Sequence, residues 1–180
     1  MRAALDVHRE LLARGVAHEV ARLRGRAASA DDLPRLLDLP AGCVAVRVYE
    51  VVREDALALA AVLVPAGSLP DPLALLEALD ACAVRLAPDD VVNARTRYAT
   101  GLVSPVCLPA DVEVLADTAV SESDVSWCAL GEGGVALGIR TADLLLAAGA
   151  RAVPLSGPAR LAAVEDVLDL DAPRGSRTTG

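Results

Sequence analysis

Two long aliphatic runs constrain the fold of this chain more than any other feature of its sequence. Residues 43–52 are rich in β-branched side chains, and residues 57–64 form a second run of the same kind. The charged segment 53–55 separates the two runs, so a β-hairpin is the most economical connection between them. The sequence therefore predicts an antiparallel pair of long strands.

Shorter helix and strand signals are mixed along the rest of the chain without a regular βαβ alternation. Helices are predicted over residues 3–14, 29–37, 73–79, 88–95, 142–147 and 161–168, and strands over 16–23, 83–86, 111–115, 125–130, 135–139 and 150–155. Ser29 and Thr141 are expected to cap helices, and residues 16–23 are expected to form an edge strand. This mixture indicates an α+β fold, a mixed and largely antiparallel sheet with packed helices. We expect one domain over residues 1–155 and a partly disordered C-terminal extension over residues 156–180.

The charge balance limits the partners of the chain. Its net charge is −8, whereas nucleic-acid binders usually present a basic face. We therefore expect the chain to bind nucleic acid only weakly on its own. Arg22, Arg24 and Arg26 form the only dense basic cluster; a solvated strand end is the favoured interpretation and a nucleic-acid contact the other. The 17 basic residues are all arginine, which excludes every mechanism that needs a lysine amine.

The composition also argues against a membrane protein and against a metal centre. The longest apolar segment, residues 56–65, is too short to span a bilayer, and charged residues interrupt any signal-like stretch at the N-terminus, so we expect a cytoplasmic protein without membrane partners. The cysteines form no CxxC pair, and His8 and His18 are not spaced with them as metal ligands. We therefore expect no metal and no cofactor, and core positions for the cysteines: Cys43, Cys82, Cys107 and Cys128.

The segment from Thr96 to Pro105 is the strongest candidate for a functional site. It gathers hydroxyls, a glycine and a Ser-Pro pair between a predicted helix and a predicted strand. A loop of this kind leaves main-chain N–H groups free to point at a ligand. Ser104 does not lie in a G-x-S-x-G turn, and both histidines are near the N-terminus, so a Ser-His-Asp triad has little support.

Two further features each allow two interpretations. Asp117 follows a predicted strand, where a lone carboxylate either caps a turn or binds a ligand amine. The glycine-rich segment from Gly131 to Gly134 lies between two predicted strands and lacks the spacing of nucleotide-binding loops. A hairpin turn is its favoured interpretation, although such a turn can also rim a pocket.

Taken together, these segments resemble the YbaK/prolyl-tRNA synthetase-associated family of aminoacyl-tRNA deacylases. Residues 96–105 align without a gap with that family's T-G-Y-x-x-G-G-V-S-P signature, with Arg97 and Leu102 in place of two glycines. Residues 37–44 resemble its L-G-x-P-x-x-x-V segment, and further matches follow at residues 115–117, at the glycine turn and at residues 141–144. The resemblance covers roughly residues 3–155.

The resemblance implies an editing hydrolase that cleaves the ester between a wrong amino acid and tRNA, usually tRNA for proline. The loop from Gly101 to Pro105 is implied to cradle the aminoacyl group with its main-chain amides, and water or the ribose hydroxyl to act without a protein nucleophile. The implied partners are mischarged tRNA and an aminoacyl-tRNA synthetase that supplies tRNA affinity in trans. The substrate-binding residues expected on this basis are Thr96, Tyr98, Gly101, Leu102, Val103, Ser104, Pro105, Asp117, Val46 and Gly131, and the expected catalytic residues are Gly101, Ser104 and Arg47.

One departure from the family bears on catalysis. The catalytic lysine of the family begins a K-T-L motif that aligns with Val46-Arg47-Val48, so the lysine position holds Val46. Arg47 is its neighbour, but alternate residues of a strand face opposite sides, and only a one-residue shift or a bulge would turn it into the pocket. Arginine also stays protonated, so it is no proton shuttle. Two hypotheses remain: an active editing hydrolase, or a non-catalytic relative that binds an aminoacyl or nucleotide group or a synthetase.

Overall fold

The structure is a computed structural model that describes residues 3–54 and 56–156. The helices are α1 (Ala4–Ala13), α2 (Leu33–Leu37), α3 (Pro72–Leu79), α4 (Asp89–Thr96) and α5 (Thr141–Ala148), with two 3-10 helices, η1 (Ala30–Asp32) and η2 (Thr118–Glu122). The strands are β1 (His18–Arg22), β2 (Cys43–Arg53), β3 (Ala56–Pro65), β4 (Ala83–Leu86), β5 (Val112–Asp117), β6 (Val125–Ala129), β7 (Val135–Arg140) and β8 (Arg151–Val153). The predicted helix over residues 161–168 and nearly all of the predicted extension lie outside the described residues.

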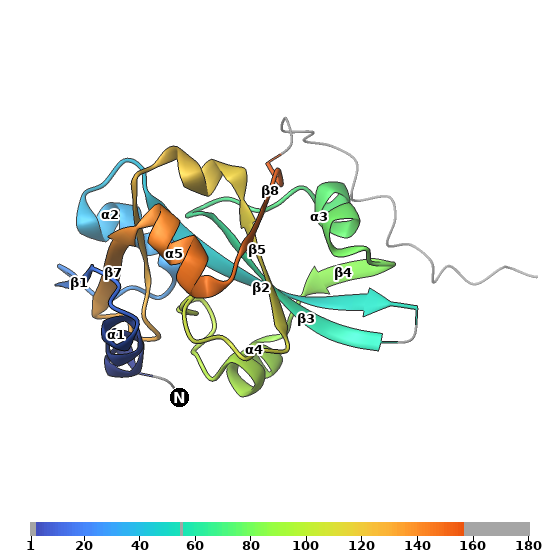
Figure 1. Ribbon diagram of the computed structural model, residues 1–180, viewed down its shortest axis with the longest axis horizontal. Helices are drawn as coiled ribbons and strands as arrows, with labels where there is room; N and C mark the ends of the chain where they lie inside the picture. Colours follow the sequence, from blue (N-terminus) through green and yellow to red (C-terminus); the bar gives the residue numbers. More distant parts are fainter. Residues whose placement is uncertain (1–2, 55, 157–180) are drawn as a thin grey trace, which may run out of the picture.

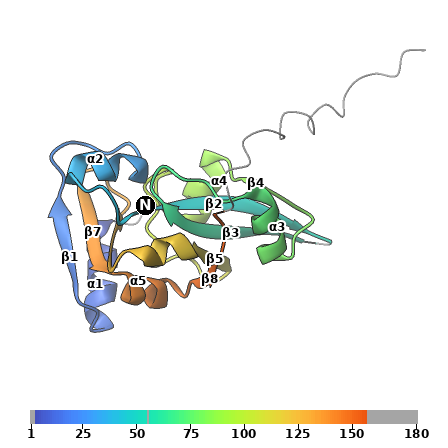
Figure 2. The ribbon, with the colours of Figure 1, turned by 90° about the horizontal axis from the view of Figure 1, so that it is seen from above.

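The strands of the described residues form one eight-stranded sheet in the order β1-β7-β6-β2-β3-β5-β8, with β4 paired to β2. The predicted hairpins are confirmed, since β2 pairs antiparallel with β3 and β6 with β7. β1 is an edge strand, as predicted, and Figure 2 shows it at one end of the molecule while the β2–β3 hairpin reaches the other. Four of the strand pairings are antiparallel and three are parallel, so the predicted α+β class with a mixed, mostly antiparallel sheet is confirmed.

Strand β2 separates two aliphatic cores because its side chains alternate between the two faces of the sheet. Val44, Val46 and Val48 pack in a core with residues of α1, α4 and α5. Cys43 and Ala45 pack on the other face with residues of α2 and α3. The helices thus lie on both faces of the sheet, around the paired strands β2 and β3 (Figure 1).

Two local predictions are wrong. Thr141 is the first residue of α5 rather than its cap, because its hydroxyl donates to the carbonyl of Ser123 and also bonds the hydroxyl of Ser126. Cys82 is exposed rather than in the core, because it lies in the turn before the edge strand β4. Ser29 does cap η1 as predicted, since its Oγ accepts a hydrogen bond from the N–H of Asp31.

Candidate functional site

Two buried side chains on the core side of the loop that follows α4 hold this loop in position. Thr96 Oγ1 donates to the carbonyl of Val92 (2.7 Å) and accepts from the N–H of Tyr98 (3.1 Å). The hydroxyl of Tyr98 donates to the carbonyl of Val106 (2.8 Å) and so joins the two ends of the loop. Thr96 and Tyr98 are fully buried. The structure therefore places these two predicted binding residues behind the loop, where they set its shape.

Gly101 brings the loop against a second segment, residues 28–32. Its φ of +78° is in the left-handed region, where glycine is favoured. A Cβ at this position would lie 3.1 Å from the carbonyl oxygen of Ala28 and 3.1 Å from the Cβ of Ser29. The N–H of Ala30 also donates to the carbonyl of Gly101 (2.8 Å). Both the conformation and the close contact therefore explain glycine here.

The glycine-rich turn after β6 is the third segment at the site. The N–H of Gly131 donates to the carbonyl of Leu102 (2.9 Å), so Gly131 is bonded to the loop. The carbonyl of Gly133 accepts from the N–H of Ala27 (2.8 Å), and a Cβ on Gly133 would lie only 2.4 Å from the carbonyl oxygen of Ala27. The turn thus connects the loop with the chain that leads into η1.

Val103 and Ser104 form the inner part of the loop. Both are buried, and Ser104 Oγ accepts a hydrogen bond from the N–H of Val106 (3.3 Å). That bond makes the hydroxyl a local turn-former. Within residues 3–54 and 56–156, the N–H groups of Val103 and Ser104 donate to no other residue. The main-chain N–H groups of buried residues rarely lack an acceptor, and those without a protein acceptor are usually bonded to water or a ligand.

Val46 and Arg47 lie on opposite faces of β2. Val46 packs in the same core as Tyr98 and Val103, whereas the adjacent Arg47 points to the other face. The ladder between β2 and β3 runs without a break from Val44 to Arg53. β2 therefore has no bulge or one-residue shift that would turn Arg47 toward the loop in place of Val46.

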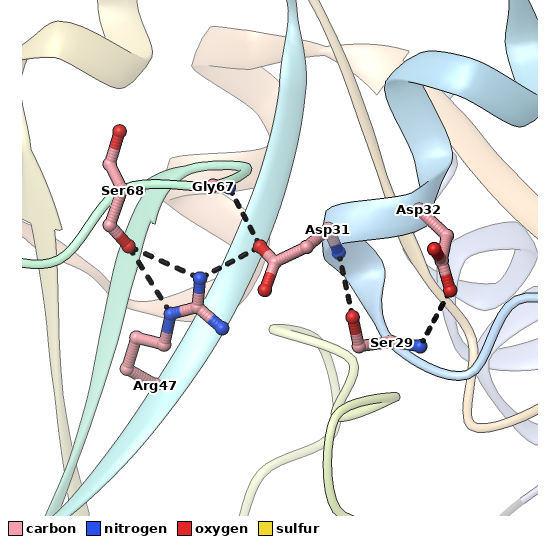
Figure 3. Close-up of polar contacts among 6 residues, drawn as sticks. All are labelled: Ser29, Asp31, Asp32, Arg47, Gly67 and Ser68. Carbon is pink, nitrogen blue, oxygen red and sulfur yellow. Dashed lines mark hydrogen bonds and ion pairs between the residues drawn. The ribbon is translucent and has the colours of Figure 1, made fainter.

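Arg47 instead links three segments through a carboxylate (Figure 3). Its Nη2 lies 2.7 Å from Asp31 Oδ1, and its Nη2 and Nε donate to the carbonyl of Ser68 at 3.1 and 3.3 Å. Asp31 Oδ1 also accepts from the N–H of Gly67 (2.7 Å). Burial alone raises the pKa of Asp31, but the hydrogen bonds from Arg47 and Gly67 outweigh it and hold that pKa below its ordinary value of 3.8. Arg47 thus acts as an anchor of η1, the helix that contacts Gly101.

Asp32 stabilises the same segment from the other side. Its Oδ2 accepts from the N–H groups of Ala28 (2.8 Å) and Ser29 (3.3 Å), and its Oδ1 lies 3.6 Å from Arg35 Nη2. The backbone hydrogen bonds from Ala28 and Ser29 are the main cause of the lowered pKa of Asp32. The sequence indicates the cap at Ser29, but no local signal indicates that residues 28–32 lie against Gly101.

Asp117 lies at the end of β5, and its side chain is buried. Its carboxylate accepts from the N–H groups of Ala119 (3.1 Å) and Leu155 (3.4 Å) and from the hydroxyl of Ser156. It caps η2, which is the first of its two interpretations.

Among the described residues, no group of three His, Cys, Asp or Glu side chains is arranged to hold a metal ion. The two histidines bond each other, with His8 Nδ1 and His18 Nε2 2.8 Å apart.

Comparisons with known proteins identify a family and solved structures with the same fold. The sequence model of the aminoacyl-tRNA editing domain family matches residues 50–146, just over half of the chain. Among solved structures, the hypothetical protein APE2540 superposes with a TM-score of 0.75 at 22% identity, covering 84% of this chain and 99% of that one. A protein described as a proposed trans-editing enzyme for prolyl tRNA synthetase superposes with a TM-score of 0.72 at 22% identity, covering 86% and 97%. No curated protein sequence matches the chain.

The family model and the shared fold define an editing-type domain. The chain belongs to the aminoacyl-tRNA editing domain family, which confirms the resemblance to the YbaK/prolyl-tRNA synthetase-associated proteins. The matched region contains the whole of the loop from Gly101 to Pro105 and the glycine turn at Gly131. None of the helices in the described part of the chain is long and apolar enough to cross a membrane.

Proposed function

We propose that this protein deacylates mischarged tRNA in trans, as a hydrolase that acts in the cytoplasm and contributes to the fidelity of translation. The observation that carries the proposal is that the main-chain N–H groups of the buried residues Val103 and Ser104 donate to no acceptor among the described residues. They lie in the loop that the family signature covers. Tyr98 and Gly131 hold that loop in position before any substrate binds.

The chemistry of the proposed reaction requires stabilisation of a developing oxyanion. A water oxygen, activated by the ribose hydroxyl, attacks the carbonyl carbon of the aminoacyl ester, and the carbonyl oxygen gains negative charge. The N–H groups of Val103 and Ser104 are donors for that oxygen, and preorganised donors in a site that excludes water are usually the largest single contribution to such catalysis. The ester C–O bond then breaks, and the ribose oxygen leaves with a proton.

One observation favours the non-catalytic alternative. In the resemblance to the family, the lysine position falls on Val46, which packs in the core, and the guanidinium of Arg47 is paired with Asp31 on the other face of β2. Neither Val46 nor Arg47 therefore provides a proton shuttle at the loop. On this alternative, the same loop binds an aminoacyl or nucleotide group, or the domain binds a synthetase, without cleavage.

A deacylation assay separates the two functions. The substrates are tRNAs for proline mischarged with alanine, cysteine or serine, assayed with and without a prolyl-tRNA synthetase. Release of amino acid above the rate in buffer supports the hydrolase, and we expect it to be faster when the synthetase is present. No release under either condition rules out the hydrolase and leaves the binding function.

A substitution at Val46 tests whether the site lacks only its lysine. Val46 is 7% exposed and faces the loop side of β2, so a lysine there is partly desolvated, which lowers the pKa of its amine toward neutrality. We expect Val46→Lys to raise the deacylation rate by about a hundredfold or more, within the range of general acid–base catalysis. The control is Arg47→Lys on the opposite face, which we expect to give no increase. Equal rates above that in buffer for Val46→Lys and the unmodified protein would show that the loop works without that amine.

A further inference from the structure

Three arginines lie at the border of the site: Arg22 ends β1, and Arg24 and Arg26 follow in the segment between β1 and η1. Both ends of this segment are bonded to the glycine turn: the N–H of Leu23 donates to the carbonyl of Gly134 (3.0 Å) and that of Ala27 to the carbonyl of Gly133 (2.8 Å). The Cγ of Arg26 lies 3.1 Å from where a Cβ of Gly133 would be. The glycine turn thus fixes the arginine segment, which comprises Arg22, Arg24 and Arg26.

These arginines differ from most others of the described chain in having no protein partner. Seven arginines form ion pairs with carboxylates: Arg14, Arg35, Arg47, Arg53, Arg85, Arg95 and Arg151. Arg22, Arg24 and Arg26 are exposed and form no hydrogen bond or ion pair with any residue in the described ranges. In a chain with a net charge of −8, three unpaired guanidinium groups within five residues form a local cationic surface.

The arginine segment is close to the loop that would hold the aminoacyl group. Arg26 precedes Ala28 by two residues, at most about 7 Å of chain, and the Ala28 carbonyl contacts Gly101. The same glycine turn that holds Arg26 also bonds Leu102 through Gly131.

Most of the neighbouring carboxylates are bonded to other groups of the protein. Asp31 is paired with Arg47, and Asp32 is bonded to two N–H groups and lies near Arg35. Glu132 accepts a hydrogen bond from the N–H of Ala4 at the start of α1. Glu19 on β1 is the nearby acidic residue that has no such partner among the described residues.

We propose that Arg22, Arg24 and Arg26 bind phosphate groups in the single-stranded 3′ end of tRNA, the end whose last nucleotide carries the amino acid. This inference rests on the proposed function, because it takes tRNA as the ligand of the adjacent loop. Guanidinium groups bind phosphate oxygens in a bidentate manner, and their contacts with the backbone do not depend on base sequence. The arginine segment therefore gives affinity for the 3′ end and orients the ester toward Gly101.

The test measures binding of uncharged tRNA as a function of salt, so it does not depend on hydrolysis. The variant Arg24→Gln/Arg26→Gln is compared with Arg9→Gln/Arg140→Gln, which removes the same charge from exposed arginines on α1 and at the far end of β7. For two lost contacts with a single strand, we expect the slope of log affinity against log salt to become shallower by about 1.4. We also expect affinity at low salt to fall at least about tenfold, while the control changes neither quantity as much.

Two outcomes overturn this inference. The first is an equal loss of affinity in the arginine-segment variant and the control variant, which would indicate a general effect of net charge. The second is that tRNA lacking its single-stranded 3′ end binds the unmodified protein as tightly as intact tRNA does. Thermal unfolding of both variants checks that the fold is intact, and the milder variant Arg24→Lys should retain most of the affinity.

The result is separable from the outcome of the deacylation assay. If the arginine-segment variant loses tRNA affinity but the unmodified protein releases no amino acid, the proposed hydrolysis fails and the tRNA contact stands. If hydrolysis is observed and the variant keeps both its tRNA affinity and its KM, the contact fails and the hydrolysis stands.

Discussion

At the scale of single residues, glycine is required in this site for two different reasons. Gly101 needs a left-handed backbone and also lies against Ala28 and Ser29, whereas Gly133 needs only space for the carbonyl of Ala27. Other glycines have the same backbone conformation without any close neighbour, for example Gly15 with a φ of +67°. These differences allow conformational strain and close contact to be measured separately.

Gly101→Ala is expected to damage both the fold and the site. The left-handed conformation costs an alanine about 1–2 kcal/mol, and the two contacts at 3.1 Å add a similar amount from overpacking. Gly15→Ala carries the conformational cost alone. We expect chemical denaturation to show a larger loss for Gly101→Ala, and deacylation activity per folded molecule to fall only in that variant. Equal losses in both variants would mean that contact with residues 28–29 is unimportant.

The pairing of Asp31 with Arg47 predicts a pH-dependent stability. Because the pKa of Asp31 is lowered in the folded state, its carboxylate stabilises the fold above the ordinary value of 3.8, and this contribution is lost as pH falls below 3.8 through the lowered value. We expect Asp31→Asn to reduce the free energy of unfolding at pH 7 by about 1 kcal/mol, a modest value since the Asp31 side chain is 35% exposed.

The measurement is urea denaturation from pH 7 down to pH 3. The difference between Asp31→Asn and the unmodified protein should shrink as the pH approaches the acid end of this range. Glu19→Gln removes an exposed carboxylate without an ion pair in the described residues and serves as the control. A difference that stays constant with pH would contradict a role for the Asp31 charge.

At the scale of secondary-structure elements, the glycine turn between β6 and β7 organises the site. It bonds the loop at Leu102 and the chain around the arginine segment at Leu23 and Ala27. Its four residues include three glycines, of which Gly133 faces the carbonyl of Ala27, whereas a Cβ on Gly134 would meet no atom within 4 Å. This turn is therefore a junction of three segments that are distant in sequence.

Gly133→Ala should separate the arginine segment from the turn. A methyl group 2.4 Å from the carbonyl oxygen of Ala27 cannot be accommodated without a backbone shift, so we expect a loss of about 1–3 kcal/mol in the free energy of unfolding. Gly134→Ala introduces a methyl group into open space and should change stability by less than about 0.5 kcal/mol. Denaturation of the two single variants in parallel tests this difference, and a similar loss in both would point to the flexibility of the turn instead.

At the scale of the whole molecule, the sheet protects its central thiols. Burial raises the pKa of Cys43 to about 11 and, together with the nearby Cys43, that of Cys128 to about 12. The two residues lie on the adjacent strands β2 and β6, whereas Cys82 is exposed. The thiols thus report on the integrity of the pairing between these strands.

Alkylation with iodoacetamide at pH 8 should label Cys82 in the native protein and leave Cys43 and Cys128 unmodified, because only the thiolate reacts and both buried thiols remain protonated. Peptide mass spectrometry identifies the labelled sites. The same reaction in denaturant is the control, in which all cysteines should react. Labelling of Cys128 at the rate of Cys82 in the native state would contradict the burial of β6.

The sequence predicts those parts of the molecule that depend on neighbouring residues. The β-branched run before Arg53 and the glycines of the second hairpin are local signals, and the structure confirms the strands and turns that they indicate. The contact of Ala30 with Gly101 joins residues about seventy positions apart, and no local pattern specifies such a contact. For the same reason the expected cap at Thr141 is wrong, since its hydroxyl bonds the distant Ser123.

The hydrogen bond from the Tyr98 hydroxyl to the Val106 carbonyl has a consequence for how such a protein can evolve. This bond lies on the core side of the loop and is fully buried. The conformation of the loop therefore depends on core residues rather than on the residues on its other side. Under the proposed function, substitutions on the ligand side would alter which amino acid fits while the positions of the main-chain donors stay constant. Selectivity and chemistry would then diverge independently in descendants of this fold.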